Sequence, residues 1–150
     1  MKICMIGTGY VGLVSGVCFS DVGNIVYCVD KDKKKIEELN KGNVPIYEPG
    51  LEEILKKNYI QNRLKFTTDL KKAVSSSDII FICVGTPTKK NSNSADLKYV
   101  ISVAKELKKI IKSYKIIITK STVPVTTGDK IENILKNLKK RKLVDIVSNP

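Results

Sequence analysis

The stretch Met1-Lys-Ile-Cys-Met-Ile-Gly-Thr-Gly-Tyr-Val-Gly12 decides the fold of this chain. Strand-like residues run directly into the spacing Gly-x-Gly-x-x-Gly, and a helix-compatible segment, residues 11–22, follows without a break. In such a turn Gly7 permits a sharp change of direction, Gly9 lets a pyrophosphate approach the backbone, and Gly12 lets the helix pack close to the strand. The first N–H groups of the helix would then face the phosphates. Because this spacing also occurs by chance, the rest of the chain has to support it.

The length and composition are those of one globular domain. The chain has 150 residues, of which 42% are hydrophobic and 28% are charged. A domain of this size buries about two thirds of its unfolded surface. No apolar run approaches the ~20 residues of a membrane span, and the chain opens on a core strand rather than on a signal peptide. We therefore expect a cytoplasmic protein without a membrane partner.

Histidine is absent from the sequence, which excludes catalytic triads and zinc sites built on that residue. The four cysteines, Cys4, Cys18, Cys28 and Cys83, have no metal-ligand spacing. Three of them fall in expected strands and one in an expected helix. We interpret all four as small buried apolar residues in a reducing compartment and predict no metal site.

The formal net charge of +12 comes almost entirely from lysine. Lysines recur at helix-face spacing, as in Lys105, Lys108, Lys109 and Lys112, which is typical of a solvated surface. The excess charge also favours a general attraction for anionic ligands. No basic run is interleaved with aromatic residues and no nucleic-acid motif occurs, so a nucleic-acid partner is not expected.

Strand-like and helix-like segments alternate along the whole chain. We expect strands at residues 2–6, 25–29, 64–67, 79–84, 116–121 and 143–147, with helices at 11–22, 33–39, 52–58, 69–74, 97–112 and 128–140. Residues 79–84 are apolar without alternation, which indicates a strand buried on both faces of a parallel sheet. The alternation predicts an α/β fold, a Rossmann-type doubly wound parallel sheet of six strands, and analogy gives the order 3-2-1-4-5-6.

In a doubly wound sheet the ligand crevice lies at the carboxyl ends of the strands. The glycine turn follows the first expected strand, Asp30 the second, Thr86 the fourth and Thr122 the fifth. These residues lie far apart in sequence and would converge in space. Their convergence supports a dinucleotide site.

Asp30 follows Gly12 at about the 20-residue interval of the dinucleotide fingerprint. Its carboxylate can accept hydrogen bonds from both hydroxyls of an adenine ribose and would repel a 2′-phosphate, so NAD is favoured over NADP. Four lysines between residues 31 and 35 weaken this preference, because basic residues there also suit a 2′-phosphate. A surface aspartate that caps the next helix is the structural alternative.

Thr86 and Thr122 stand at strand ends, close to prolines. A hydroxyl there suits the nicotinamide or the reacting carbon, where it would position substrate or water. The alternative is a turn hydroxyl bonded to local backbone. Glu48, in the loop Tyr47-Glu-Pro-Gly50, leaves a similar choice between ligand contact and loop capping.

No nucleophile–base pair can be assembled from the sequence. Cys83 falls in a buried apolar strand, where a thiol is inert, and Lys120 would act as a base only if it were desolvated. The chain can hold a dinucleotide but offers no complete catalytic machinery.

Six motifs occur in order along essentially the whole chain: Lys2-Ile-Cys-Met-Ile-Gly-Thr-Gly-Tyr-Val-Gly-Leu13, Val29-Asp30, Leu39-Asn-Lys-Gly42, Pro45-Ile-Tyr-Glu-Pro-Gly-Leu51, Val84-Gly-Thr-Pro87 and Lys120-Ser-Thr-Val-Pro124. As a set they resemble the amino-terminal domain of the UDP-glucose 6-dehydrogenase family, within the wider group of nucleotide-sugar dehydrogenases. That family oxidises the C6 alcohol of the sugar to a carboxylate, transferring hydride to two NAD⁺ in succession through a cysteine-bound thioester. The fourth motif favours UDP-glucose over GDP-mannose or UDP-N-acetylmannosamine.

The resemblance also implies which residues form the site. Its glycine turn is Gly7, Gly9 and Gly12, and Tyr10 within it also binds the cofactor. Val11 lies at the pyrophosphate, Asp30 and Lys35 at the adenosine ribose, Thr86 near the cofactor, and Thr122 near the nicotinamide and the catalytic water. Only Thr122 is thereby given a part in catalysis, and the implied cofactor is NAD.

The chain departs from the family's pattern after Asn149-Pro150. The family continues there with a Glu-Phe-Leu-Arg-Glu-type segment, a central helix and a UDP-sugar-binding domain with the catalytic cysteine, lysine and asparagine. The resemblance implies that residues 1–150 are an NAD-binding domain, inactive alone, of an enzyme that is homo-oligomeric at full length. A hydroxyacid or 6-phosphogluconate-type dehydrogenase and a basic anion- or nucleic-acid-binding module are the alternatives.

Overall fold

One parallel sheet forms the centre of the molecule. The computed structural model describes residues 1–89, 95–124 and 126–149. Six strands lie in the order β3-β2-β1-β4-β5-β6, and every pair is parallel. The predicted fold class and strand order are confirmed. The strands are β1 (Lys2–Ile6), β2 (Ile25–Val29), β3 (Leu64–Thr67), β4 (Ile79–Ile82), β5 (Lys115–Thr119) and β6 (Val144–Ser148).

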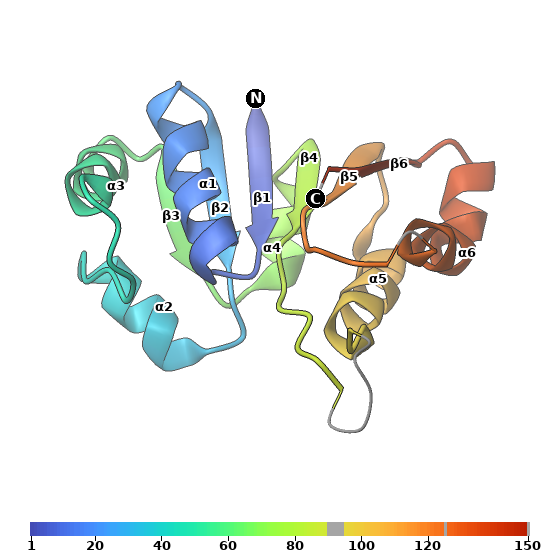
Figure 1. The fold of residues 1–150 in the computed structure, drawn as a ribbon. Coiled ribbons are helices and arrows are strands. Elements are labelled where there is room, and N and C mark those ends of the chain that lie inside the picture. Colours follow the sequence, from blue (N-terminus) through green and yellow to red (C-terminus); the bar gives the residue numbers. More distant parts are fainter. Residues whose placement is uncertain (90–94, 125, 150) are drawn as a thin grey trace.

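Helices cover both faces of the sheet (Figure 1). They are α1 (Tyr10–Asp21), α2 (Lys33–Asn40), α3 (Leu51–Ile60), α4 (Leu70–Ser75), α5 (Lys98–Ile110) and α6 (Thr127–Lys140). The first three contribute buried residues to one apolar cluster, and the last three contribute to the cluster on the opposite face. The helical stripe expected in α5 is buried at Val100, Ala104 and Leu107.

The central strand β1 shows why the sheet is parallel and internal. Cys4 and Ile6 belong to one apolar cluster, whereas Ile3 and Met5 belong to the other. A strand whose successive side chains are all apolar can be buried only between two helical layers. The carboxyl end of β1 therefore lies in the middle of the sheet, between the ends of β2 and β4.

Two expected strands are shorter than predicted at their carboxyl ends. β4 ends at Ile82 rather than at residue 84, and β5 ends at Thr119 rather than at residue 121. The N–H groups of Lys120 and Ser121 both donate to the carbonyl oxygen of Ile82, at 2.9 and 3.2 Å. Two donors on one acceptor break the regular ladder, and both chains leave the sheet at this point.

The expectation that all four cysteines are buried is wrong for one of them. Cys4, Cys28 and Cys83 are buried, but Cys18 is exposed on α1. Its neighbour Val17 carries the contact with the core instead, because adjacent helical positions point about 100° apart. Among the described residues, no helix has the length and apolar character needed to cross a membrane.

Candidate functional site

The glycine turn joins β1 to α1 so tightly that two of its positions exclude any side chain. Gly7 has a φ of +103°, and a Cβ there would lie 2.8 Å from the carbonyl oxygen of Cys83. A Cβ at Gly12 would collide with the carbonyl oxygen of Gly7. These contacts confirm the sharp turn and the close helix–strand packing that the sequence predicts for the two residues.

Gly9 serves a different purpose, because a Cβ at this position would meet nothing within 4 Å. Gly9 precedes α1 as its N-cap and supplies no side-chain hydrogen bond, and the first turn of the helix has no acidic residue. The first N–H groups of a helix lack intrahelical partners and carry its positive dipole end. An uncapped end beside open space fits a diphosphate.

Asp30 follows β2 and is held by four donors. Its Oδ2 accepts from the backbone N–H of Thr8 at 3.0 Å, from Thr8 Oγ1 at 2.8 Å and from Lys35 Nζ at 3.2 Å. Its Oδ1 accepts from the N–H of Asp32 at 3.1 Å. Burial raises the pKa of Asp30, but the hydrogen bonds from Thr8, Asp32 and Lys35 outweigh burial and hold this pKa below its usual value. The carboxylate is thus ionised and fixed against the glycine turn.

The structural alternative for Asp30, a cap on the next helix, is not what the contacts show. Asp32 is the N-cap of α2, and its Oδ1 accepts from the N–H of Lys35 at 3.1 Å. Asp30 is therefore left to face the glycine turn. Of the lysines that complicated the choice of cofactor, Lys35 is paired with Asp30, and Lys31 Nζ lies 4.7 Å from the ring centroid of Tyr99.

A crevice of about 390 Å³ runs along the carboxyl ends of β1, β2 and β4. It brings together four of the residues expected at the site: Gly7, Gly9, Asp30 and Lys35. Sequence patterns had not singled out the remaining wall. That wall includes Thr68 and Leu70 after β3, and Tyr99, Ser102, Val103 and Glu106 of α5. The only sequence signal for the α5 residues is their spacing of i, i+3, i+4 and i+7, which places them on one helical face.

Thr86 and Thr122 are brought together at the ends of β4 and β5, although neither lines this crevice. Thr86 Oγ1 donates to the carbonyl oxygen of Thr122 at 3.0 Å. Beside them, Ser121 Oγ donates to the carbonyl oxygen of Val84 at 2.7 Å. The Thr86 hydroxyl is thus engaged with backbone across the two strand ends, while Thr122 is exposed.

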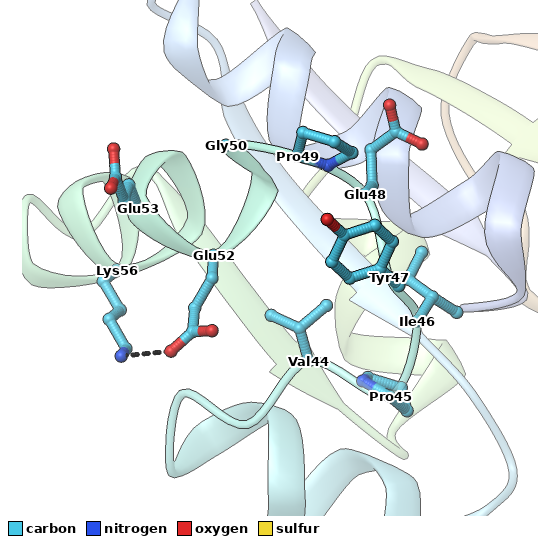
Figure 2. A pocket seen from close by; sticks show the side chains of 10 residues that line it. All are labelled: Val44, Pro45, Ile46, Tyr47, Glu48, Pro49, Gly50, Glu52, Glu53 and Lys56. Carbon is cyan, nitrogen blue, oxygen red and sulfur yellow. Dashed lines mark hydrogen bonds and ion pairs between the residues drawn. The ribbon is translucent and has the colours of Figure 1, made fainter.

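Tyr10 and Val11 begin α1, and both are exposed outside the crevice. The Tyr10 hydroxyl donates to Glu48 Oε2, and this hydrogen bond raises the pKa of Tyr10 above its usual value. Figure 2 shows Glu48 and Tyr47 on the loop that leads into α3, where residues 44–50, Glu52, Glu53 and Lys56 line a cavity of about 870 Å³. Glu48 therefore ties this loop to the glycine turn.

Groups for covalent or metal chemistry are not assembled in the described part of the chain. Burial raises the pKa of the Cys83 thiol to about 12, so the thiolate needed for nucleophilic attack is scarce at neutral pH. Lys120 Nζ donates to Asn149 Oδ1 at 3.2 Å, and the positive charge of Lys120 lowers the pKa of Cys83 by less than burial raises it. Within residues 1–89, 95–124 and 126–149, no group of three or more acidic or cysteine side chains could hold a metal ion.

Comparison with known proteins gives consistent matches over the whole chain. The sequence model described as "UDP-glucose/GDP-mannose dehydrogenase family, NAD binding domain" matches residues 1–150. The chain is 52% identical to a UDP-glucose 6-dehydrogenase of Rhizobium meliloti over 150 residues, which are 100% of this chain and 34% of that protein. It is 51% identical to UDP-glucose 6-dehydrogenase TuaD of Bacillus subtilis, covering 99% of this chain and 32% of the relative.

Solved structures agree with this assignment. A GDP-mannose dehydrogenase of Pseudomonas aeruginosa superposes with a TM-score of 0.93 at 39% identity, covering all of this chain and 36% of the other. A UDP-glucose dehydrogenase of Pyrobaculum islandicum superposes with a TM-score of 0.88 at 35% identity, covering 99% of this chain and 35% of the other. The chain thus spans about a third of the length of the relatives that it matches.

Proposed function

Because this chain belongs to the UDP-glucose/GDP-mannose dehydrogenase family, of which it is an NAD-binding domain, we propose that it is the cofactor-binding portion of a UDP-glucose 6-dehydrogenase. The proposed reaction of the whole enzyme converts UDP-glucose, two NAD⁺ and water into UDP-glucuronate and two NADH. The observation that carries the proposal is the identity of 52% and 51% to two UDP-glucose 6-dehydrogenases along essentially the whole chain. In the family the nicotinamide of NAD⁺ is the hydride acceptor.

The diphosphate of the cofactor would lie at Gly9 and the uncapped start of α1, where Tyr10 and Val11 are the first helical residues. Free N–H groups and the helix dipole stabilise anionic oxygens at this end. Tyr10 contributes by fixing the loop through Glu48. Gly7 and Gly12 keep the turn compact, so that the backbone itself is the binding surface.

The adenosine ribose would lie against Asp30 and Lys35. Asp30 Oδ2 already accepts three hydrogen bonds, whereas Oδ1 accepts one, from Asp32. A carboxylate oxygen has about two acceptor positions, so Oδ1 keeps one for a ribose hydroxyl. A 2′-phosphate would meet the negative charge of Asp30, and Lys35 is already paired with that carboxylate.

The nicotinamide would extend toward Thr86 and Thr122 at the ends of β4 and β5. The Thr86–Thr122 hydrogen bond holds the two strand ends in register, and the exposed hydroxyl of Thr122 would orient the substrate or the catalytic water. Cys83 lines the crevice, but burial raises the pKa of its thiol to about 12, so this cysteine is poorly suited to act as the nucleophile. We therefore expect no turnover by this chain alone.

Calorimetric titration with NAD⁺ and NADP⁺ tests the cofactor assignment. We expect heat from NAD⁺ and much weaker binding of NADP⁺. Asp30→Ala should weaken NAD⁺ binding by roughly 1–3 kcal/mol, as loss of a charge-assisted hydrogen-bond acceptor does. Asp129→Ala removes the same charge from the first turn of α6 and is the matched control. If the wild-type chain binds neither dinucleotide, the result contradicts the proposed function.

The second candidate is a GDP-mannose dehydrogenase, favoured by the TM-score of 0.93 to such an enzyme. The sugar-binding residues lie outside the cofactor site, so binding of NAD⁺ cannot separate the two candidates. Turnover of the whole enzyme with each nucleotide sugar separates them, and we expect oxidation of UDP-glucose.

A further inference from the structure

One face of α5 forms part of the wall of the crevice. Tyr99, Ser102, Val103 and Glu106 all line it, and their spacing places them within two turns on the same side of the helix. Leu70, at the start of α4, lines the same crevice. Asp30 and Lys35 line the same crevice, so we infer that a base attached to a ribose held by them would lie against this part of the wall.

The part of the crevice between α4 and α5 has side chains that suit a flat, apolar ring. Leu70 and Val103 are partly buried and pack against the apolar cluster on this face of the sheet, so both are backed by the core. Tyr99 adds an aromatic edge, and the ammonium group of Lys31 lies 4.7 Å from its ring centroid. Two supported aliphatic side chains give a purine apolar surface, but they do not distinguish one purine from another.

Polar side chains on the same face of α5 can distinguish one purine from another. Ser102 and Glu106 lie four residues apart on α5. A serine hydroxyl can donate or accept, whereas an ionised carboxylate only accepts. Within the part of the chain that the structure describes, no side chain forms an ion pair with Glu106. Its carboxylate is therefore available to accept a hydrogen bond from a ligand.

We propose that Glu106 accepts a hydrogen bond from the exocyclic amino group of the cofactor's adenine, and so makes the site selective for a 6-aminopurine over a 6-oxopurine. The proposal rests on the proposed function, in which NAD occupies the crevice. A 6-oxo group presents an acceptor to the carboxylate where the amino group presents a donor, and the ring N1–H that accompanies it lies one atom away from that position. Ser102 serves either purine, so it adds affinity without selectivity.

The test compares NAD⁺ with nicotinamide hypoxanthine dinucleotide, in which a 6-oxo group replaces the 6-amino group and the ring nitrogen N1 carries a proton. Calorimetric titration of the wild-type chain should give about 10-fold tighter binding of NAD⁺, the effect expected for one hydrogen bond to an exposed charged group. In Glu106→Gln the amide can turn its NH₂ group toward a 6-oxo oxygen. The preference should therefore fall to within about 3-fold, because the amide serves either purine.

Two further variants distinguish a change in purine selectivity from a general change in dinucleotide binding. Glu53→Gln removes the same charge from exposed α3, outside the crevice, and should keep the wild-type preference. Ser102→Ala should weaken both dinucleotides and leave their ratio unchanged. Equal binding of the two dinucleotides by the wild-type chain would overturn the role of Glu106 while NAD binding stands, and so would an unaltered ratio in Glu106→Gln. If neither dinucleotide binds the wild-type chain, the proposed function fails together with this inference.

Discussion

At the scale of single residues, Asp30 joins the parts of the cofactor site. It contacts Thr8 in the glycine turn, Asp32 before α2 and Lys35 within α2. Its side chain is only 14% exposed, so these hydrogen bonds form in a region where a charge needs partners. The same residue therefore supports the turn and, in the function that we propose, would contact the cofactor.

Asp30→Asn should lower stability in a pH-dependent way. The pKa of Asp30 is lower in the folded chain than its ordinary value of 3.8, so its charge stabilises the fold above that pH, and the contribution is lost as pH falls through the folded pKa. We expect urea unfolding to show a loss of about 1–2 kcal/mol at pH 7, which shrinks below about pH 3.8. A difference that stays constant down to pH 3 would contradict this account.

At the scale of elements, the β1–α1 unit depends on close approach between backbones. The strand enters a turn at Gly7, and the helix begins at Tyr10, only three positions later. The helix crosses over the carbonyl oxygen of Gly7 at Gly12. A neighbouring helix in the same layer, α3, is tied to α1 by Asp21, which accepts from Lys57 Nζ at 2.7 Å and from Asn58 Nδ2 at 3.0 Å.

Gly12→Ala and Gly9→Ala make a matched pair within this unit. The first places a methyl group against the Gly7 carbonyl oxygen, and we expect it to lower the free energy of unfolding by about 3 kcal/mol. The second places a methyl group in open space and should change stability by less than about 1 kcal/mol. Urea denaturation measures both. Equal effects of the two substitutions would show that the close approach at Gly12 does not limit stability.

At the scale of the whole molecule, the surface is dominated by lysine. The chain carries 27 basic and 15 acidic residues, a formal net charge of +12. Several ion pairs among the described residues are exposed, as in Lys41–Glu38 and Lys56–Glu52. Exposed pairs contribute little, so the uncompensated positive charge works against the compact state.

Added salt should therefore stabilise the molecule. Screening is effective when the Debye length falls to about 8 Å near physiological ionic strength, and lysines on α5 and α6 then repel one another less. We expect the thermal unfolding temperature to rise by a few degrees between about 20 mM and about 200 mM NaCl. A falling temperature would mean that attractive pairs outweigh repulsion. Binding of DNA that weakens steeply with salt would instead favour the basic-module alternative.

Local patterns in the sequence are sufficient to predict the strands and the glycine turn, whereas the strand order was predicted by analogy with other doubly wound sheets. Apolar runs, glycine spacing and helix stops are local signals, and they are the same in any context that can bury the apolar faces. They also placed Asp30 at the end of β2 and Thr86 and Thr122 close to the ends of β4 and β5. Strand ends were less predictable, since β4 and β5 stop where two N–H groups meet one carbonyl oxygen across the sheet.

The contacts between side chains that lie far apart in sequence are known from the tertiary structure alone. Thr8 and Asp30 are 22 residues apart, Thr86 and Thr122 are 36 apart, and Tyr10 and Glu48 are 38 apart. The α5 residues that line the crevice are even farther in sequence from the glycine turn that lines it with them. Contacts of this kind depend on how the helices pack over the sheet, and a one-dimensional pattern does not specify that packing. Local sequence motifs therefore indicate which ligand the chain binds, whereas the shape of the crevice depends on how the whole chain folds.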